Sequence, residues 1–399
     1  MAAAALRRLA VAMLVLALAA CSTTSTSWLN PMSWGLPAPS LDWLTGRGAA
    51  AKPGPLPELA ATANPVVAWQ AGIGRSHSGL VPAVVERTVY AAAADGTLVR
   101  IDGETGRVVW RTSAGRALAA GPGADATLVV VGTDKGDVLA FDTDGKPAWS
   151  ARVSSEVIAP PLVAEGVVVV VSGDGRIFGI TAADGKTKWV HQRTNPPLTV
   201  RNTAGPVTSR GGVFVGTAGG RLLALDLQTG IVGWDGTVAI PKGATELERI
   251  ADVTSRPVVE ERQACAVAYQ GRLVCFEIVR GAVNWTREVS SLSGIAADAS
   301  AFYVVDDAGA IHALDKSTGA SLWRQDTIKG RRPTAAQVMG SQLAVLDLEG
   351  YVHVFAKSTG TYVGRIATDG TPTTGQPRLL GERIVFESSA GNVYAIAAR

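Results

Sequence analysis

Cysteine and histidine are scarce in this sequence. Its 399 residues include three cysteines and four histidines, and no pair of histidines has metal-ligand spacing. No Gly-x-Ser-x-Gly nucleophile motif occurs. Neither sign of charge dominates, since 37 lysines and arginines face 34 aspartates and glutamates. We therefore expect a protein that is not an enzyme, with no metal site, no cofactor and no nucleic-acid partner.

A single long apolar run stands at the N-terminus. Arg7 and Arg8 precede apolar residues 9–20, a stretch too short to span a bilayer as a mature anchor, so residues 1–20 are predicted to be a signal peptide. The run ends Leu-Ala-Ala before Cys21, which resembles the bacterial lipobox. That resemblance implies a lipidated Cys21 at the start of the mature chain. The alternative is an ordinary signal peptide followed by a chance cysteine.

Residues 21–64 are predicted to be a flexible tether. They are rich in Ser, Thr, Pro, Gly and Ala, a composition that cannot bury enough apolar area to order itself. Three tryptophans in it, Trp28, Trp34 and Trp43, would lie on the membrane surface or on the folded body, and the sequence leaves both open. By resemblance to enterobacterial lipoproteins, Ser22 after the lipidated cysteine implies the outer membrane, with the body facing the periplasm.

The rest of the chain is built from a repeat. Eight times a glycine is followed by a mostly apolar segment and then by an acidic, threonine or alanine residue; the glycines are Gly96, Gly136, Gly175, Gly220, Gly271, Gly309, Gly350 and Gly391. Six copies lead through a glycine-containing turn to a tryptophan, namely Trp110, Trp149, Trp189, Trp234, Trp285 and Trp323. The seventh has Gly364 at this place. The tryptophans are 39, 40, 45, 51 and 38 residues apart, the period of a propeller blade.

The repeat predicts an all-β fold, an eight-bladed β-propeller of four-stranded antiparallel blades over residues 65–399. In the first unit, residues 81–86, 88–93 and 98–102 form strands A to C, and strand D ends at Trp110. The last copy, 391–397, has no strand D after it, whereas residues 65–69 resemble a strand D with no strands before it. We expect the N-terminal strand to pair with the C-terminal blade and close the ring.

Two residue types in the repeat are expected to be structural. The repeat tryptophans, including Trp69, should wedge between adjacent blades. The aspartates that end the repeat, Asp102, Asp142, Asp226 and Asp315, should bond the backbone of the turns that follow.

The remaining two cysteines, Cys265 and Cys275, flank a turn in a compartment where disulfides can form. A two-residue turn would place them on opposite sides of the sheet, and a three-residue turn would place them opposite each other. We expect two free, buried thiols.

The excess length of the chain is concentrated in two neighbouring connections between a strand D and the next strand A, residues 190–205 and 235–254. All such connections leave a propeller on the face that carries the B-to-C turns, so these two should lie side by side. Long loops on a rigid scaffold are common binding sites. The candidate partner-binding residues are Leu198, Val200, Arg201 and Asp252, apolar side chains beside charges of opposite sign. The alternative is that these are solvated charges on long loops.

The glycines and tryptophans of the repeat resemble the quinoprotein-type propeller, which raises a periplasmic quinone-dependent (PQQ-type) dehydrogenase as the alternative function. The enzymes of that type look much longer and often carry adjacent cysteines, which this chain lacks.

A lipidated tether before an eight-bladed propeller resembles, over essentially the whole chain, the BamB family of outer-membrane assembly lipoproteins. Residues 198–201 (Leu-Thr-Val-Arg) are similar to the family's Leu-x-Leu-Arg stretch, and residues 245–253 to its Thr-Glu-Ile-Asp-Arg-Leu-x-Asp-Val stretch. Thr254 stands where the family often has a second acid. The resemblance implies a non-catalytic protein that binds the periplasmic domains of the BamA barrel and assists the folding and insertion of outer-membrane proteins. Unfolded outer-membrane proteins are a second class of candidate partner.

Overall fold

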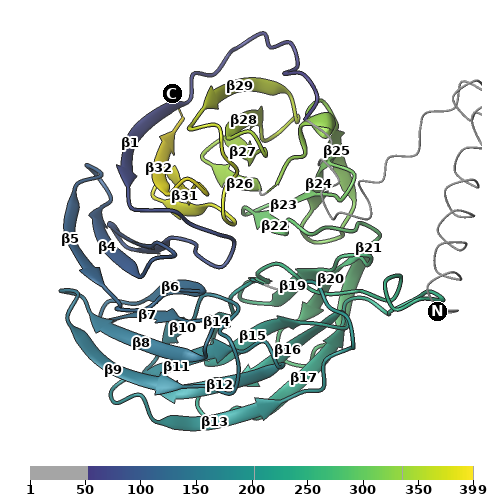
Figure 1. Cartoon of the computed structure of the whole chain (residues 1–399). Helices are drawn as coiled ribbons and strands as arrows, with labels where there is room; N and C mark the ends of the chain where they lie inside the picture. The colour runs from purple at the N-terminus through teal and green to yellow at the C-terminus, as the bar shows by residue number, and fades with distance from the viewer. Residues whose placement is uncertain (1–52, 202, 335, 399) are drawn as a thin grey trace, which may run out of the picture. The chain divides into compact units, whose positions relative to one another are not determined.

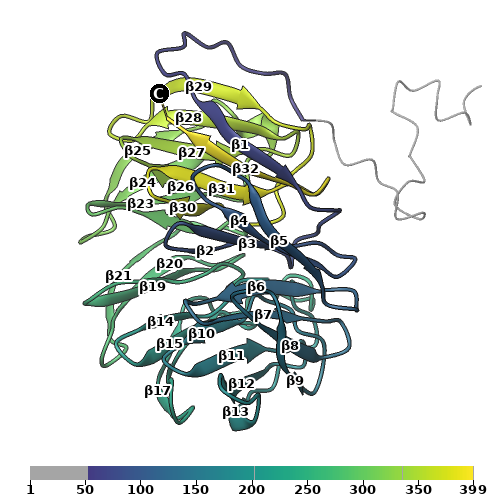
Figure 2. The same cartoon turned by 90° about the vertical axis from the view of Figure 1, so that its left-hand side faces the viewer.

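The computed structural model describes residues 53–399 apart from 202, 335 and 399, so the predicted signal peptide, Cys21 and the tether tryptophans lie outside the described residues. The described chain forms eight four-stranded antiparallel sheets, the blades, arranged in a ring (Figures 1 and 2). Each innermost strand contacts the innermost strands of both neighbouring blades. The predicted eight-bladed propeller is therefore confirmed. No helix among the described residues is long and apolar enough to cross a membrane.

In each blade we name the strands A to D from the channel outward. Blades one to four contain β2 (Ala83–Val85), β3 (Thr88–Ala92), β4 (Thr97–Asp102) and β5 (Val108–Ser113); β6 (Ala120–Ala124), β7 (Leu128–Gly132), β8 (Asp137–Asp142) and β9 (Pro147–Arg152); β10 (Leu162–Ala164), β11 (Val167–Val171), β12 (Arg176–Thr181) and β13 (Thr187–Gln192); β14 (Val207–Ser209), β15 (Gly212–Thr217), β16 (Arg221–Asp226) and β17 (Val232–Thr237).

Blades five to eight follow the same order. They contain β18 (Val258–Val259), β19 (Gln263–Val267), β20 (Leu273–Glu277) and β21 (Val283–Arg287); β22 (Ile295–Ala297), β23 (Ala301–Val305), β24 (Ile311–Asp315) and β25 (Ser321–Gln325); β26 (Ala336–Met339), β27 (Gln342–Leu346), β28 (Tyr351–Ala356) and β29 (Tyr362–Ala367); β30 (Arg378–Leu380), β31 (Arg383–Glu387), β32 (Asn392–Ala397) and β1 (Val66–Gly72).

Burial follows the position of a strand in its blade. The B strand β11 is a run of valines, buried except at its last residue, because both of its faces pack against neighbouring blades. The D strand β9 is exposed or half-buried throughout, since it forms the outer edge. The D strands also continue past the repeat tryptophan, as β5 extends to Ser113 rather than ending at Trp110.

The ring closes between the two ends of the chain. Strand β1 pairs antiparallel with β32, with Val66 opposite Ala397 and Gly72 opposite Asn392. Both views show purple β1 alongside yellow β32 (Figures 1 and 2). The predicted closure is confirmed, and the last blade is completed by the first strand of the chain.

The tryptophans lie between blades, as predicted. Each ring packs on a glycine in the C-to-D turn of the next blade. The contact leaves no room for a side chain at the glycine, since a Cβ on Gly281, for example, would lie only 2.6 Å from the ring of Trp234. Each indole N–H also donates to a backbone carbonyl of that next blade, at 2.7–3.2 Å; the donors are Trp69, Trp110, Trp149, Trp189, Trp234, Trp285 and Trp323. The glycine and the tryptophan of the repeat thus form one contact between neighbouring blades.

The aspartates that end the repeat hold their turns, which confirms their predicted role. Asp102 Oδ1 accepts hydrogen bonds from the backbone N–H and the hydroxyl of Thr105, at 2.9 and 2.7 Å. These bonds lower the pKa of Asp102 because they stabilise the carboxylate. The same bonds recur at Asp226 and Asp315, and Asp142 accepts from backbone N–H groups of its turn.

Blade seven departs from the repeat because residues 53–64 pack beside it. The backbone N–H groups of Thr62 and Ala63 both donate to Val363 O, and a Cβ on Gly364 would lie 2.9 Å from Ala63 O. Arg365 donates to Pro57 O at 2.8 Å. This segment runs past β29 (Figures 1 and 2). It lies within the predicted tether yet is bonded to the body, and it occupies the place where a tryptophan would otherwise stand.

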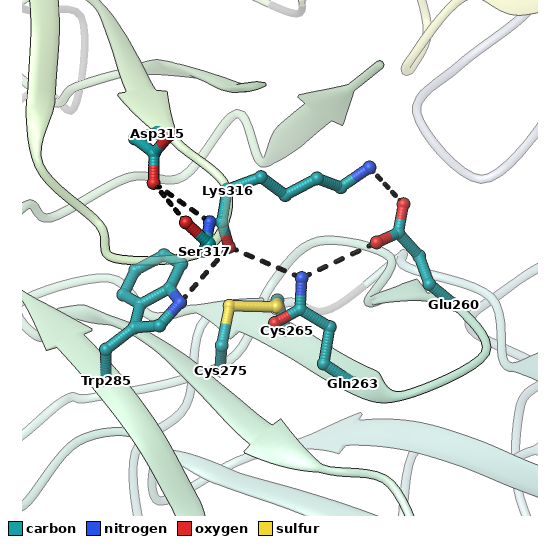
Figure 3. The surroundings of a disulfide bond; sticks show 8 residues. All are labelled: Glu260, Gln263, Cys265, Cys275, Trp285, Asp315, Lys316 and Ser317. Carbon is teal, nitrogen blue, oxygen red and sulfur yellow. Dashed lines mark hydrogen bonds and ion pairs between the residues drawn. A yellow bond between two sulfur atoms is a disulfide. The ribbon is translucent and has the colours of Figure 1, made fainter. Parts of the chain in front are cut away.

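The expectation of two free thiols is wrong. Cys265 and Cys275 stand directly opposite each other in β19 and β20 and form a disulfide, with an S–S distance of 1.99 Å. The turn between the strands has the three-residue form, since Ala268 N–H donates to Arg272 O. Figure 3 shows Trp285 and Gln263 on either side of the disulfide, both donating to Lys316 O. The bridge therefore lies buried at the junction of blades five and six.

Candidate functional site

The two long connections lie on one face of the propeller. The first, residues 193–206, joins β13 to β14, and the second, residues 238–257, joins β17 to β18. The second begins against the B-to-C turn of blade four, where Val238 and Ala239 donate backbone hydrogen bonds to Gly220 O. The predicted face is therefore confirmed, and we call it the D–A face.

Asp252 fastens the two long connections to each other. Its Oδ2 accepts a hydrogen bond from Val200 N–H at 2.6 Å, and its Oδ1 accepts one from Gly219 N–H at 2.8 Å. The residue is only 1% exposed. Burial raises the pKa of Asp252, while the two backbone N–H groups act in the opposite direction.

The buried position of Asp252 corrects the expectation that it lies beside Arg201 as an accessible charge. Both of its carboxylate oxygens accept backbone hydrogen bonds, one from Val200 in the first connection and one from Gly219 in the B-to-C turn of blade four, so a partner could not reach them without displacing those bonds. The Asp252 carboxyl group positions the first connection against the second. It does not form part of the exposed surface.

Arg201 instead pairs with a residue that the sequence pattern did not indicate. Its guanidinium lies 3.0 Å from the carboxylate of Glu156, which belongs to the short connection between blades two and three. The Arg201 side chain is 56% exposed, so this ion pair leaves most of the guanidinium free to contact solvent or a partner. Leu198 is 43% exposed and Val200 is half-buried.

A cavity of about 230 Å³ opens beside this ion pair. Val200, Arg201, Glu156 and Ile158 are among the residues that line it. The lining of the cavity therefore combines apolar and charged side chains, and the cavity has room for a side chain of a docked protein.

Further apolar side chains lie on the same long connections and were not among the predicted residues. Ile240 and Leu247 of the second connection are 60% and 68% exposed. Leu292, in the connection from blade five to blade six, is also exposed, and its carbonyl accepts a hydrogen bond from the Thr254 hydroxyl. The match between 245–253 and the family stretch could have pointed to Leu247, but no sequence signal singled out Leu292 or Glu156.

The tip of the second connection is ordered by its own hydrogen bonds. Glu248 accepts from the backbone N–H groups of Ala244 and Thr245, at 2.8 and 3.0 Å, and these bonds lower its pKa. Thr245 Oγ1 accepts in return from Glu248 N–H. This reciprocal pattern is the capping box of helix N-termini, here closing a turn. The exposed Leu247 is therefore presented on a fixed turn.

The site as a whole is suited to contact with a protein. It presents separate exposed apolar side chains, one exposed ion pair and a small cavity on loops that hydrogen bonds hold in place. Among the described residues, no three His, Cys, Asp or Glu side chains are placed together so that they could hold a metal ion.

Comparison with known proteins places the chain in a family. A family model described as outer membrane protein assembly factor BamB matches residues 60–118, 94–325 and 307–399. The BamB of Bordetella pertussis is 39% identical over 349 residues, covering 87% of this chain and 90% of that protein. The BamB of Nitrosomonas eutropha is 40% identical over 331 residues, covering 82% of this chain and 81% of that protein.

Solved structures agree with this. The crystal structure of BamB from Moraxella catarrhalis superposes with a TM-score of 0.77 at 27% identity, covering 84% of this chain and 100% of that one. A quinohemoprotein alcohol dehydrogenase from Comamonas testosteroni superposes with a TM-score of 0.66 at 13% identity, covering 83% of this chain and 76% of that one. At that identity the likeness concerns the fold alone. The chain belongs to the BamB family of outer membrane protein assembly factors.

Proposed function

We propose that this chain is a non-catalytic docking lipoprotein of the outer-membrane β-barrel assembly machinery. Its D–A face binds the periplasmic domains of BamA, and the bound propeller assists the folding and insertion of outer-membrane proteins. The observation that carries the proposal is the fastening of the two long connections by Asp252, which holds Leu198 and Arg201 exposed on one face. Family membership supports the same role.

The contact has a defined chemistry. Leu198 supplies an apolar anchor, and the largely exposed Arg201 guanidinium supplies donors that can pair bidentately with a partner carboxylate. Because the loops are already fixed before binding, little conformational entropy is lost on association. Exposed Leu247 and Ile240 extend the apolar contact along the second connection.

A charge reversal tests the proposal. Arg201→Glu should weaken binding to the purified periplasmic domains of BamA by at least about 2 kcal/mol, roughly thirtyfold, because it removes the cation and adds a repelling charge. Isothermal titration calorimetry measures the loss. The melting temperature should change little, since the ion pair with Glu156 that the reversal breaks is partly exposed and such surface pairs contribute about 0–1 kcal/mol.

Lys186→Glu is the matched control. Lys186 lies 81% exposed in the C-to-D turn of blade three, which is on the face opposite the long connections. This reversal should leave binding unchanged. Equal binding by both variants, each with an unaltered melting temperature, would mean that the D–A face is not the dock.

We propose further that Cys21 carries the lipid anchor that holds the protein at the outer membrane. The lipobox-like residues before Cys21 support this, and each buried acyl CH₂ contributes about 0.8 kcal/mol to membrane attachment. Cys21→Ser should shift the protein from the membrane fraction to the soluble periplasmic fraction. Membrane attachment that survives high-salt washing in this variant would refute the anchor.

A further inference from the structure

The central channel of the propeller contains two arginines. Arg256 lies two residues before β18 in blade five, and Arg378 is the first residue of β30 in blade eight, so both lie where the chain enters an inner strand. Three adjoining cavities, of about 220, 210 and 370 Å³, are each lined by both residues. The first is bordered by the segments that lead from the D–A face into the inner strands, so it forms the mouth of the channel on that face.

Neither arginine has an anionic partner. No other described residue forms a hydrogen bond or an ion pair with Arg256 or Arg378. Water can reach both side chains, which are only partly buried, yet the surrounding protein lowers the pKa of each by desolvation. The charge of Arg256 lowers the pKa of Arg378 further. Two positive charges therefore line the same cavities, and no negatively charged side chain among the described residues is paired with them.

The lining of the channel is otherwise neutral near the arginines. The two smaller cavities have no Asp or Glu in their walls. The third contains one carboxylate, Glu260, which is already paired with Lys316. Glu387, a buried carboxylate in blade eight, lines none of the three cavities and interacts with neither arginine. No carboxylate that lines these three cavities is thus free to pair with either arginine.

A buried hydroxyl without a partner lies at the same mouth. Ser255 is 4% exposed, its Oγ has no hydrogen-bond partner, and it lines the first cavity beside Arg256. Gln376 lies close to it. Both the side-chain nitrogen of Gln376 and the Cβ of Ser255 lie within 2.5 Å of the point where a Cβ on Gly294 would stand. Buried polar atoms are rarely left unpaired, so an orphaned hydroxyl beside two unpaired cations indicates a missing acceptor.

We propose that the mouth of the central channel is a binding site for a small, multiply charged oxyanion, held by Arg256 and Arg378 with the Ser255 hydroxyl as a further donor. Guanidinium groups match carboxylate and phosphate oxygens in geometry and charge. A cavity of about 220 Å³ fits a free phosphate or a small polycarboxylate. The site lies on the same face as the long connections but uses none of the proposed docking residues, Leu198, Val200 and Arg201.

Titration of the whole purified chain with inorganic phosphate and with citrate tests the proposal, with chloride at equal ionic strength as the reference. The wild type should bind at least one of the two with a Kd of about 1 mM or tighter, measured by calorimetry. Its melting temperature should rise with the concentration of that anion. The anion that binds more tightly distinguishes a phosphate site from a carboxylate site.

The double variant Arg256→Gln and Arg378→Gln should lose at least about tenfold in affinity, because both charge-assisted contacts are gone. It should fold in chloride with an equal or higher melting temperature, since two uncompensated charges are removed. Arg287→Gln is the control. It removes the same charge from the exposed end of β21 in blade five, and it should bind the anion as the wild type does.

Phosphate and citrate also stabilise proteins by exclusion from their surface, so the difference between variants decides the outcome. A thermal response of equal size in the wild type and the double variant, with no calorimetric binding, would overturn the proposal. If the double variant does not fold, Arg378→Gln alone should still weaken binding. Wild-type affinity in that single variant would also overturn it.

Discussion

The contacts between neighbouring blades repeat around the ring, whereas the contacts on the D–A face are each unique. Between blades, one contact is used seven times, a tryptophan ring on a glycine with an indole hydrogen bond to the same neighbouring blade. On the D–A face, the contacts of Asp252 and Arg201 occur once each and join connections of unequal length. The repeated tryptophan–glycine contacts hold the ring together, and the long connections, which do not repeat, form a surface on which binding can be specific.

Blade seven shows the same difference within the ring itself. Its glycine, Gly364, replaces the tryptophan because the next blade is completed by β1 from the chain's own N-terminal end, and residues 62–65 approach from there. A departure from the repeat therefore has either a structural cause, as here, or a functional one, as we propose for the long connections. The following variants separate the two.

The largest effect is expected at a contact between blades. Trp234 is 9% exposed, packs against Phe214 and Phe276, and donates to Ile278 O at 2.8 Å. Trp234→Ala should lower the free energy of unfolding by about 3–5 kcal/mol, because it leaves a cavity between blades four and five. Urea unfolding measures this, and binding of the folded fraction to the BamA periplasmic domains should be unchanged.

Val283→Ala is the control for that variant, since Val283 is an exposed residue of an outer strand and should change stability by within about 0.5 kcal/mol. A Trp234→Ala protein as stable as the Val283→Ala protein would mean that the tryptophan contacts do not hold the blades together.

An intermediate effect is expected at Asp252, where the two regions meet. Asp252→Ala leaves the N–H groups of Val200 and Gly219 without acceptors and should cost about 1–3 kcal/mol of stability. It should also weaken partner binding although the carboxylate is not on the surface, because the first connection is no longer held against the second. Hydrogen exchange should become faster at the Val200 and Gly219 amides.

Faster exchange at those two amides with undiminished binding would show that the loops need not be fastened for docking. Unchanged exchange would contradict the positioning role itself. Asp252→Asn serves as the graded comparison, because it keeps one acceptor oxygen and should fall between the alanine variant and the wild type.

The sequence predicts the ring well because its determinants recur. A glycine followed 13 or 14 residues later by a tryptophan marks six of the eight blades, and the unpaired segments at the two ends of the chain predict the closure through β1 and β32. The repeat does not predict the disulfide between Cys265 and Cys275. Two turn lengths were compatible with the residues there, and only the three-residue form places the sulfurs together.

The candidate site is less predictable because its contacts are long-range and occur once. Loop length located the two connections, and the apolar Leu198 is exposed as expected. The burial of Asp252 and the pairing of Arg201 with Glu156 depend on how three connections fold over one another, and nothing in the local pattern encodes that. The two channel arginines lie 122 residues apart in blades five and eight, so only the closed ring brings them together.

The smallest effect on stability is expected for Leu198→Ala, which tests whether the D–A face binds through exposed apolar side chains. Because Leu198 is 43% exposed, its truncation should alter the free energy of unfolding by within about 0.5 kcal/mol. Binding to the BamA periplasmic domains should nevertheless weaken by about 1 kcal/mol, roughly fivefold. Leu322→Ala is the matched control, an equally conservative truncation of a leucine that is 55% exposed on β25, the outer strand of blade six. It should leave binding unchanged, since β25 belongs to the outer edge and not to the long connections. If both truncations weakened binding equally, the partner would contact the outer strands as well, and the division between a structural ring and a binding face would not hold.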